Sequence, residues 1–559
     1  MDNAEKAQSG CLRVAILWHH HQPYYTVGEE MPLPWVRLHA AKDYCDLSHL
    51  HFEFPDLRLT YNVVPSLILQ LQEYQGTVRD VVQRLSSLEP ATLSEQEKRD
   101  ILTLFFRCNV ATMVHPYQRY NELYVKSRDE NNAIRVYTIQ DWLDLQVWYN
   151  LTWIGELSRQ HPAIQSLLKK GGNFTVTEKN IVLSFHELLM RNVLPVLSEL
   201  QKAGIAELSV TPLYHPILPL LIDSDVAKEA TPELPLPQRR YHQLNDADYH
   251  VQRGQLIFEQ TFNTAAKGMW LAEGSISDSA LSLIATRGIT WTATDEHVLR
   301  NTLGDNYTST SKYFPYRIAL PYAKHITLFF RDHSLSDAIG FDYQHWKAED
   351  AAANFIERLC SIRSLLIKEH GESVLDEAVV PVILDGENCW EYYQNNGVDF
   401  LRALYKCLSE HPELRTVHFS TVTEQCTPVP ERTLEHITAG SWIFGNFKIW
   451  IGHDEKNAAW DELRKARKLI DSRRVTHAIW KEAMEHIYIA EGSDWFWWYG
   501  DDHSADSRHI FDEIFRYHLR AVYELFDEKI PAVLKKPMMK NTSGDSSFSA
   551  MHKVSESDL

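Results

Sequence analysis

The stretch Val379–Trp390 reads VVPVILDGENCW and joins an apolar run to a polar cluster. Its first six residues are hydrophobic or proline and lack the alternation of a strand with one exposed face. A strand buried on both sides, as in a parallel sheet covered by helices, has this composition. Two carboxylates, Asp385 and Glu387, follow where the run ends. The stretch therefore predicts a buried parallel strand with titratable groups at its carboxyl end.

Similar runs recur along the chain, and segments with helical periodicity separate many of them. The eight candidate strands are Leu12–Trp18, Leu57–Asn62, Ala206–Pro212, Gly268–Glu273, Ile289–Asp295, Ile326–Asp332, Val379–Asp385 and Val417–Thr423. The helical segments include Val64–Tyr74, Ile181–Lys202, Ala351–Glu369 and Val398–His411. Alternating strands and helices predict a parallel α/β architecture.

Polar or titratable side chains follow seven of these runs. They are His19 to Gln22, Asn62, Thr211 to His215, Glu273, Asp295 to His297, Arg331 to His333, and Asp385 to Asn388. Any strand must end in a polar loop, so a single case carries little weight. In a barrel, however, the carboxyl ends of all strands meet on one face, which carries the chemistry. The repeated pattern predicts an active site on that face.

The length of 559 residues predicts more than one domain. We expect a disordered N-terminus at 1–10 and a catalytic barrel at 11–430 that contains a helical insertion at about 75–174. A strand-free, helical C-terminal domain is expected at 431–535. The Ser-rich, polar segment 536–559 is expected to be a disordered tail.

Charge and cysteine usage narrow the class of protein. With 56 basic and 75 acidic residues the net charge is 56 − 75 = −19, which disfavours nucleic acid and anionic membranes as partners and suits a neutral substrate. No run approaches the roughly 18 apolar residues of a membrane span. The seven cysteines are widely spaced and contain no C-x-x-C pair, which predicts neither a disulfide framework nor a thiolate zinc site. We therefore expect a cytoplasmic protein.

Two strand ends carry the carboxyl groups that glycoside hydrolysis requires. A retaining mechanism needs one carboxylate as nucleophile and a second carboxyl group as general acid/base. Glu273 and Asp385 each stand where an apolar run meets a glycine, so partial burial should raise their pKa values. The pattern alone is weak in a chain with 75 acidic residues. We expect the two groups to face each other across one pocket.

His19 and His21 lie two residues apart at the first strand end, so both point to the same side. Two imidazoles can bind a metal with a third ligand such as Asp332 or Asp385, which would suit a metal-dependent carbohydrate deacetylase or an α-mannosidase-like enzyme. They can equally contact sugar hydroxyls, or form a buried hydrogen-bonded pair.

Two further clusters are ambiguous. The segment Arg331–Asp337 could bind substrate or anchor a loop through salt bridges. The segment Asp494–Asp502 (DWFWWYGDD) combines carboxylates with aromatic platforms for sugar rings, but it could also fill a domain interface.

Taken together, seven stretches in chain order resemble the signature regions of glycoside hydrolase family 57, and the match spans about 12–530. Five resemble the general signatures and two the amylase and amylopullulanase branch. The stretches are Trp18–Tyr24, Val210–Pro219, Trp270–Glu273, Leu384–Asn388, Ala439–Asn446, Phe330–Phe341 and Gly492–Asp502.

This resemblance implies a distorted TIM-like (β/α)7 barrel followed by a C-terminal helical bundle. By position, Glu273 corresponds to the family nucleophile and Asp385 to the acid/base. The further positions expected to bind substrate are His19, His21, Gln22, His215, Trp270, Arg331, Asp332, Asp337, Glu387, Trp390, Trp442, Trp498 and Asp501. The family needs no metal or other cofactor for catalysis.

The resemblance implies a retaining hydrolase of α-glucan chains or maltooligosaccharides, acting on α-1,4 and conceivably α-1,6 linkages. A 4-α-glucanotransferase or an α-glucan branching enzyme is the alternative within the same chemistry. The chain departs from the family at Ala272, where proline is common, at Gly274-Ser275, where Cys-Ala is common, and at Cys389, where proline is frequent. These neighbours shape the loops that decide specificity.

Overall fold

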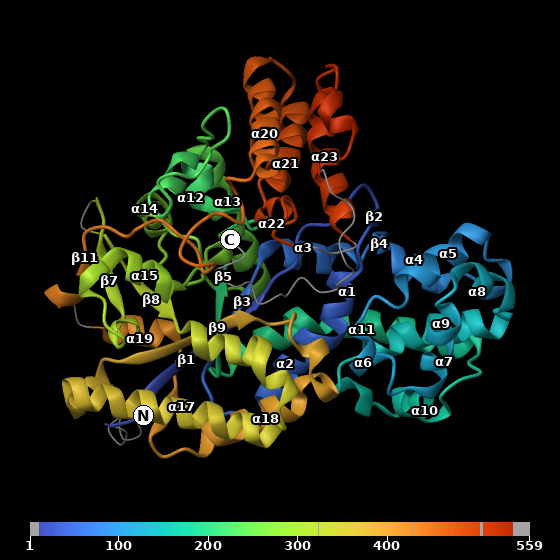
Figure 1. The fold of residues 1–559 in the computed structure, drawn as a ribbon, viewed down its shortest axis with the longest axis horizontal. Coiled ribbons are helices and arrows are strands. Elements are labelled where there is room, and N and C mark those ends of the chain that lie inside the picture. Colours follow the sequence, from blue (N-terminus) through green and yellow to red (C-terminus); the bar gives the residue numbers. More distant parts are fainter. Residues whose placement is uncertain (1–9, 322–323, 427–428, 504–506, 540–559) are drawn as a thin grey trace.

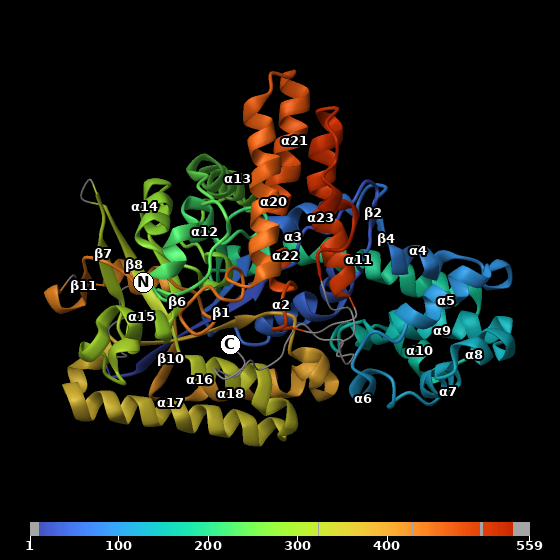
Figure 2. The same ribbon diagram turned by 45° about the horizontal axis from the view of Figure 1, so that its top comes forward.

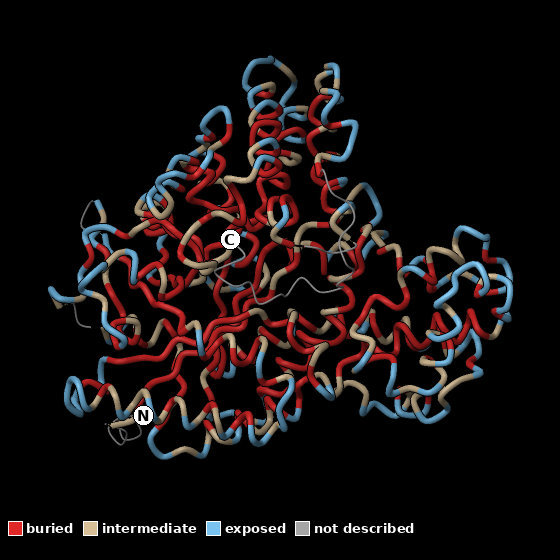
Figure 3. Tube along the Cα trace, viewed as in Figure 1, coloured by how far each residue is buried: buried red, intermediate tan, exposed pale blue. Residues whose placement is uncertain are grey.

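The apolar runs form the parallel strands of a barrel at the centre of the molecule. The computed structural model describes residues 10–321, 324–426, 429–503 and 507–539. The long strands of the barrel are β1 (Leu12–His20), β3 (Leu59–Val63), β5 (Ala206–Val210), β6 (Trp291–Asp295), β8 (His325–Arg331) and β9 (Val379–Asp385). All nine residues of β1 are buried, and buried backbone runs through the centre in Figure 3. The continuous apolar composition of β1 and β9 follows from this burial on both faces.

Seven staves close the barrel. β9 pairs with β1, β1 with β3, and β3 with β5, all in parallel. The segment 268–269 forms isolated parallel bridges with Val210 of β5 and Trp291 of β6. β6 pairs with β8, and the amide of Asp332 donates to the carbonyl oxygen of Pro381 at 2.9 Å, which links β8 to β9. The expected (β/α)7 barrel is therefore present.

Two of the eight expected strands are not regular strands. Gly268–Glu273 makes only the two bridges, so it fills a stave position without forming a strand. Val417–Thr423 is wrong as a strand, because α19 (Phe419–Gln425) occupies most of it and buries Phe419 and Val422 at helical spacing. The short strand before it, β10 (Leu414–Thr416), pairs with β1 instead.

Helices cover the outside of the barrel between the strands (Figure 1). Those that follow or flank the barrel strands are α1 (Trp35–His39), α2 (Cys45–Phe52), α3 (Pro65–Glu73), α11 (Val176–Lys202), α12 (Leu218–Ile222), α13 (Leu244–Phe262), α14 (Asp278–Thr286), α15 (Glu296–Leu303), α16 (His333–Asp337), α17 (Ala348–His370) and α18 (Val398–Glu410). The four segments expected to be helical between the strands coincide with α3, α11, α17 and α18 to within a few residues.

A lobe of short helices lies between β3 and α11, on the right of Figures 1 and 2. It contains α4 (Val81–Ser87), α5 (Glu95–Leu104), α6 (Val110–Met113), α7 (Gln118–Ser127), α8 (Glu130–Val136), α9 (Ile139–Thr152) and α10 (Pro162–Lys170). A two-residue strand, β4 (Arg79–Asp80), pairs with β2 (Glu30–Met31) at its edge. The capping boxes at Ser94 and Thr138 begin α5 and α9, as expected for Ser or Thr three residues before an acid.

The C-terminal region is helical and stands over the barrel, in orange and red in Figure 2. It consists of α20 (Asp454–Ser472), α21 (His477–Ala490), α22 (Ser493–Trp497) and α23 (Arg508–Leu525). One short strand, β11 (Thr433–Leu434), lies within 431–535 and pairs with β7 (Tyr316–Ala319), so the expectation of no strand there is wrong.

Parts of both expected disordered ends lie outside the described residues, namely 1–9 and 540–559. Of the expected tail, the stretch 536–539 is described and contacts the helical region. The amide of Met538 donates to Asp512 at 3.1 Å, and Met539 is buried. The proposed domain limits remain predictions.

One described helix, α11, is long and apolar enough to cross a membrane by length and composition alone. In this fold α11 packs against α2, α9 and β5, and 39% of its most apolar window is buried. A core helix that covers a barrel has the same composition.

Candidate active site

The carboxyl ends of the barrel strands surround a cavity of about 270 Å³. Both expected catalytic acids line it: Asp385 at the end of β9, and Glu273 after the bridging segment 268–269. His19 and His21 reach it from the end of β1, and Arg331 from the end of β8. Residues separated by hundreds of positions therefore meet because parallel staves end on one face.

The carboxyl group of Glu273 is held by two neighbours. The indole Nε1 of Trp442 donates to its Oε2 at 2.8 Å, and Nδ1 of His215 lies 3.8 Å from its Oε1. Burial, and then the negative charges of Asp494 and Asp385, raise the pKa of Glu273 well above its usual value. The Trp442 hydrogen bond acts in the opposite direction, because it stabilises the ionised form that a nucleophile needs.

The backbone is strained around this group. Only four described residues other than Asn, Asp and Gly have positive φ: Tyr214 (60°), His215 (56°), Glu273 (59°) and Phe444 (50°). Glu273 and Phe444 line the cavity, and Tyr214 and His215 belong to the loop whose histidine approaches Glu273. Such conformations are costly for residues with a Cβ and concentrate at functional sites.

Asp385 ends β9 opposite His19 of β1 in the strand register. Its Oδ2 accepts a hydrogen bond from Nδ2 of Asn388 at 2.9 Å. Burial raises the pKa of Asp385 above its usual value, which suits a group that must donate a proton near neutral pH. The next residue must be glycine, since a Cβ on Gly386 would stand 2.4 Å from Cδ2 of His20.

Glu387 and Gln22 lie deeper in the same cavity wall, and both are buried. Nε2 of Gln22 donates to the hydroxyl of Tyr44 at 3.2 Å, and its Oε1 accepts from the hydroxyl of Tyr25 at 3.3 Å. Burial, and then the charge of Asp385, raise the pKa of Glu387 well above its usual value. The burial of Glu387 and the charge of Asp385 therefore both favour the protonated form of Glu387.

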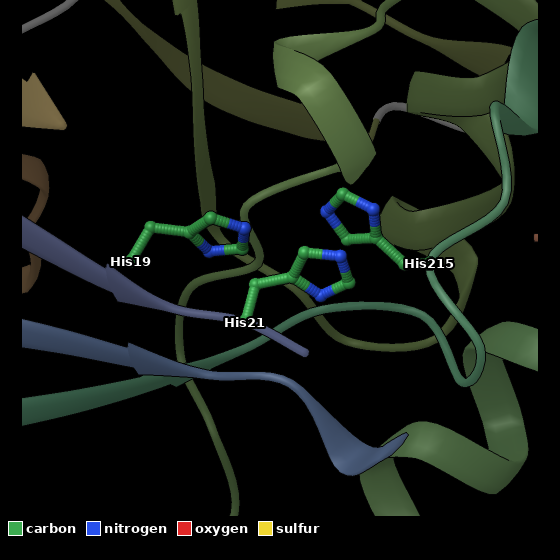
Figure 4. Close-up of side chains that lie close together, drawn as sticks. All are labelled: His19, His21 and His215. Atoms are coloured by element: carbon green, nitrogen blue, oxygen red, sulfur yellow. The ribbon is translucent and has the colours of Figure 1, made fainter. Parts of the chain in front are cut away.

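Three histidines form a stack beside the acids (Figure 4). The ring centroids of His21 and His215 lie 3.7 Å apart with planes at 20°, and those of His19 and His21 lie 5.5 Å apart with planes at 14°. Burial lowers the pKa values of His19 and His215 well below their usual range. These two rings are neutral, so they can act as hydrogen-bond acceptors as well as donors.

The tautomer of His19 follows from its neighbour Asn62. Oδ1 of Asn62 accepts from the hydroxyl of Thr211 at 2.8 Å, while its Nδ2 donates to Ser209 at 3.0 Å, which orients the amide. Nδ1 of His19 lies 2.7 Å from that oxygen and therefore carries the proton. Nε2 of His19 keeps its lone pair and is buried without a partner among the described residues. It is ready to accept a hydrogen bond from a sugar hydroxyl.

The stack is a poor metal site although its nitrogens lie within 4.8 Å of one another. A metal bound by three imidazoles needs lone pairs that converge on one point. Each lone pair lies in the plane of its ring, and the planes of these stacked rings are nearly parallel, so they do not meet at a nearby point. A second group, Asp295, His297 and His333, also meets the distance criterion. There, the guanidinium of Arg331 lies 3.3 Å from Asp295 and opposes a second cation.

Arg331 organises one wall of the cavity. Its guanidinium donates to Asp337 at 2.7 Å and to Asp295 at 3.3 Å, and its carbon lies 5.5 Å from the ring of Trp442. Burial opposes charge on His333, but hydrogen bonds with Asp295 and Asp337 outweigh it and raise the pKa of His333 to about 9. Arg331 and His333 therefore place two positive charges beside the acids at neutral pH.

Aromatic side chains from separate parts of the chain complete the walls. Trp442, Phe444, Trp497 and Trp498 come from the C-terminal region, while Trp35 comes from α1 and Trp153 from the end of α9 in the helical lobe. Flat aromatic faces provide stacking surfaces for sugar rings at low entropic cost. The helical region thus forms one wall of the cavity whose floor carries the acids.

The sequence matches Glycosyl hydrolase family 57 over residues 15–438. The chain belongs to this family. A search of curated proteins finds no significant match.

Solved structures with the family 57 fold align over nearly the whole chain. The branching enzyme of Pyrococcus horikoshii has 15% identity and a TM-score of 0.58, with 96% of this chain and 98% of that chain covered. The α-amylase of Thermotoga maritima has 15% identity and a TM-score of 0.56, with 92% and 93% covered. The 4-α-glucanotransferase of Thermococcus litoralis has 13% identity and a TM-score of 0.51, with 92% and 60% covered. At these identities the likeness shows the fold.

Most of the residues expected from the family 57 resemblance meet at one cavity. Those that line it are Glu273, Asp385, His19, His21, Gln22, Arg331, Asp337, Glu387, Trp442 and Trp498. His215 does not line it but stacks on His21.

Four expected substrate-binding residues lie elsewhere. Trp270 is buried beneath the cavity, with its ring centroid 5.3 Å from that of Trp442. Trp390 is buried against Trp18. Asp332 begins α16 by accepting from the amide of Leu335, and it pairs with Lys312. The side chain of Asp501 is 80% exposed.

These four have physical roles that a motif cannot reveal. A tryptophan at a strand end can support the site from below, and an aspartate before a short helix is a common N-cap. Asp501 is separated from the cavity-lining Trp498 by a turn at Gly500, which has φ of 85°.

The cavity residues missing from the expected set include Asp494, His333 and Trp153. Asp494 accepts from Nε2 of His21 at 2.8 Å. The sequence offered a signal for Asp494, since it begins the aromatic and acidic segment DWFWWYGDD, and for His333, which follows Arg331-Asp332. No signal identifies Trp153, because it lies at the end of α9, in a lobe with no recognised motif.

Proposed function

We propose that this family 57 protein cleaves α-glucan chains with retention of anomeric configuration. In this proposal Glu273 attacks the anomeric carbon, and Asp385 protonates the leaving oxygen and later activates water. The observation that carries the proposal is that Glu273 and Asp385, from different staves, line one cavity together. Burial raises the pKa of both carboxyl groups, and the proposed roles require that Glu273 loses its proton before Asp385 does.

Each acid accepts one hydrogen bond that favours its ionised form, while burial opposes ionisation of both. Glu273 accepts a hydrogen bond from an indole N–H, which can donate but cannot accept, and this favours the carboxylate. Asp385 accepts a hydrogen bond from the amide of Asn388, but burial raises its pKa, so it holds a proton more readily near neutral pH than an exposed aspartate. A nucleophile must be ionised at the start of the cycle, and the acid must be protonated.

The walls favour a neutral, ring-shaped substrate. His19 presents an acceptor nitrogen, Arg331 and His333 present donors, and tryptophans provide flat apolar faces. Three proteins with a similar fold are named as a branching enzyme, an α-amylase and a 4-α-glucanotransferase, and all three names refer to α-glucan chemistry. Together these support α-glucan or maltooligosaccharide as the substrate.

Transfer to a second sugar is the other candidate activity, as in a 4-α-glucanotransferase or a branching enzyme. It is favoured by the aromatic walls from three separate regions, because a stacked acceptor sugar would displace water from the covalent intermediate. A deacetylase or mannosidase activity that depends on metal receives no support from the stacked geometry of the histidines.

One experiment tests the proposal and divides the two activities. The protein is incubated with maltooligosaccharides and with amylose, and the products are separated by chromatography while reducing ends and iodine staining are followed. Hydrolysis releases shorter chains together with new reducing ends, whereas transfer redistributes chain lengths without them. The fold of the wild-type protein is checked by a measurement that does not depend on activity. If the folded protein leaves the substrate unchanged in both incubations, the proposal is overturned.

We also propose a reducing, cytoplasmic location and a protein that binds neither nucleic acid nor membrane. All seven cysteines are free, and the net charge is −19. Extraction under thiol-trapping conditions tests whether the location is reducing. Seven labelled thiols are expected, and a pair of cysteines protected from the label would contradict a reducing location.

A further inference from the structure

The C-terminal helical region reaches into the histidine stack at one point, the start of α22. Gly492 forms a backbone bridge with Pro216. The amide of Ser493 donates to the carbonyl oxygen of His215 at 2.9 Å, and its hydroxyl lies 2.9 Å from Nδ1 of the same histidine. The next residue, Asp494, accepts from Nε2 of His21 at 2.8 Å. Two consecutive residues thus hold two stacked rings.

Asp494 has few other contacts. Its side chain is 13% exposed, and its one ion-pair partner among the described residues is His21. The other nitrogen of that ring, Nδ1, is buried without a hydrogen-bond partner in the described part of the chain. The carboxylate can only accept, so a neutral His21 facing Asp494 carries its proton on Nε2 and leaves Nδ1 as an acceptor.

The stacked rings of His21 and His215 connect Asp494 to the proposed nucleophile, Glu273, through direct contacts. His21 lies flat on His215 with centroids 3.7 Å apart, and Nδ1 of His215 lies 3.8 Å from Oε1 of Glu273. A ring that turned or changed tautomer at His21 would disturb the packing of His215 and the hydrogen bond between His215 and Ser493. The position of these rings therefore depends on an acid delivered by another domain.

We propose that Asp494 is a positioning residue of the active site, which fixes the ring and the proton of His21 beside Glu273. The inference deepens the proposed glycosidase function and rests on it for the role of Glu273. It gives the C-terminal region a second role besides forming one wall of the cavity. Without α22, His21 and His215 lose the hydrogen bonds that hold their rings in place.

The negative charge of Asp494 should also change how activity depends on pH, in a direction that follows from its effect on the two catalytic acids. Titratable and charged groups from several elements line the cavity with Glu273 or approach it. They are His19 and His21 at the end of β1, His39 of α1, His215 after β5, Arg331 of β8, His333 and Asp337 of α16, Asp385 of β9, Glu387 and Glu391 after β9, and Asp494 of α22. After burial, the charge of Asp494 is the largest influence that raises the pKa of Glu273, and it also raises that of Asp385. Removing this charge lowers both pKa values, so both limbs of a bell-shaped profile move to lower pH.

The test compares Asp494→Asn with wild type and with Glu482→Gln, a matched loss of one negative charge at an exposed position of α21. With maltooligosaccharide as substrate, Asp494→Asn is expected to lower kcat/KM about 10- to 100-fold at the wild-type optimum, as for loss of a hydrogen bond to a charged group. The profile should shift to lower pH, while Glu482→Gln behaves as wild type. An unshifted profile with kcat/KM within twofold of wild type would overturn the proposal.

A second readout does not need turnover. In ¹⁵N spectra of histidine-labelled protein, with His21→Gln used for assignment, wild-type His21 should show a protonated Nε2 and Asp494→Asn should show a mixture of tautomers. If wild type fails to act on maltooligosaccharides, the proposed function fails while this readout still tests the positioning role. An identical His21 spectrum in both proteins would contradict it.

Two further variants guard against misfolding and indirect effects. Asp494→Glu keeps the negative charge and should keep the proton of His21 on Nε2. This variant replaces Asp494→Asn in the test if the asparagine variant does not fold, and loss of the Nε2 tautomer of His21 in it would count against the proposal. In a double-mutant cycle, Asp494→Asn should cost much less in a His21→Gln background. Full additivity would show that Asp494 does not act through His21.

Discussion

Replacing Trp442 by phenylalanine removes one hydrogen bond from the proposed nucleophile while keeping an aromatic ring in place. The indole Nε1 donates to Oε2 of Glu273 at 2.8 Å. The ring also packs against Trp270, with centroids 5.3 Å apart, and against the guanidinium of Arg331 at 5.5 Å. Phenylalanine preserves most of that packing, so the change isolates the hydrogen bond.

The size and sign of the effect follow from the charge on the acceptor. A hydrogen bond to a charged group contributes about 1.5–3 kcal/mol, which corresponds to about 1–2 pKa units at 1.36 kcal/mol per unit. The bond favours the ionised form, so its loss raises the pKa of Glu273, which burial has already raised. The acid limb of kcat/KM reports ionisation of the nucleophile in the free enzyme. It should therefore move to higher pH by about 1–2 units.

The assay is kcat/KM for a maltooligosaccharide across the pH range, with Trp480→Phe as the control. Trp480 lies on α21 and is 41% exposed, so its replacement should leave the profile unchanged. An acid limb that stays in place in Trp442→Phe, or moves to lower pH, would refute the assignment of the hydrogen-bonded Glu273 as the ionised nucleophile.

Three further outcomes are expected. Glu273→Gln should retain the fold and lower kcat by several orders of magnitude, and residual activity above roughly a tenth of wild type would show that another group is the nucleophile. The same variant should have a higher Tm than wild type at pH 7 but not at pH 4. The folded-state pKa of Glu273 lies above its usual value of 4.5, so ionisation of Glu273 costs stability only as the pH rises above that value. Calorimetry that gives equal Tm differences at both pH values would contradict this. A chain ending after Met539 should keep wild-type activity, because Met538 and Met539 retain their contacts with α23; a loss measured in the maltooligosaccharide assay would place a required element in 540–559.

The barrel was predictable from sequence because its strands are buried on both faces. The apolar runs Leu12–Trp18, Ile289–Asp295 and Val379–Asp385 carry that signal directly, and each coincides with a strand to within two residues. The prediction was wrong at Val417–Thr423, where a short apolar run fits a buried helix as well as a strand. It also missed β7, an antiparallel strand outside the barrel path.

The acids of the candidate site were predictable, but their supports were not. Glu273 and Asp385 stand at strand ends with glycine after them, which is visible in sequence. The left-handed backbone of Glu273 is not, since a glutamate shows no preference for positive φ and the strain is imposed by packing around it. Asp494 lies 473 residues from His21, and only the folded chain shows that they touch.

The anomeric form of the first product tests the central claim most directly. Proton NMR recorded early in the cleavage of a maltooligosaccharide by wild-type protein distinguishes the α-anomer from the β-anomer before mutarotation mixes them. A double displacement through Glu273 and Asp385 inverts the anomeric carbon twice. The account predicts that the α-anomer appears first, and a product that begins as the β-anomer would contradict it.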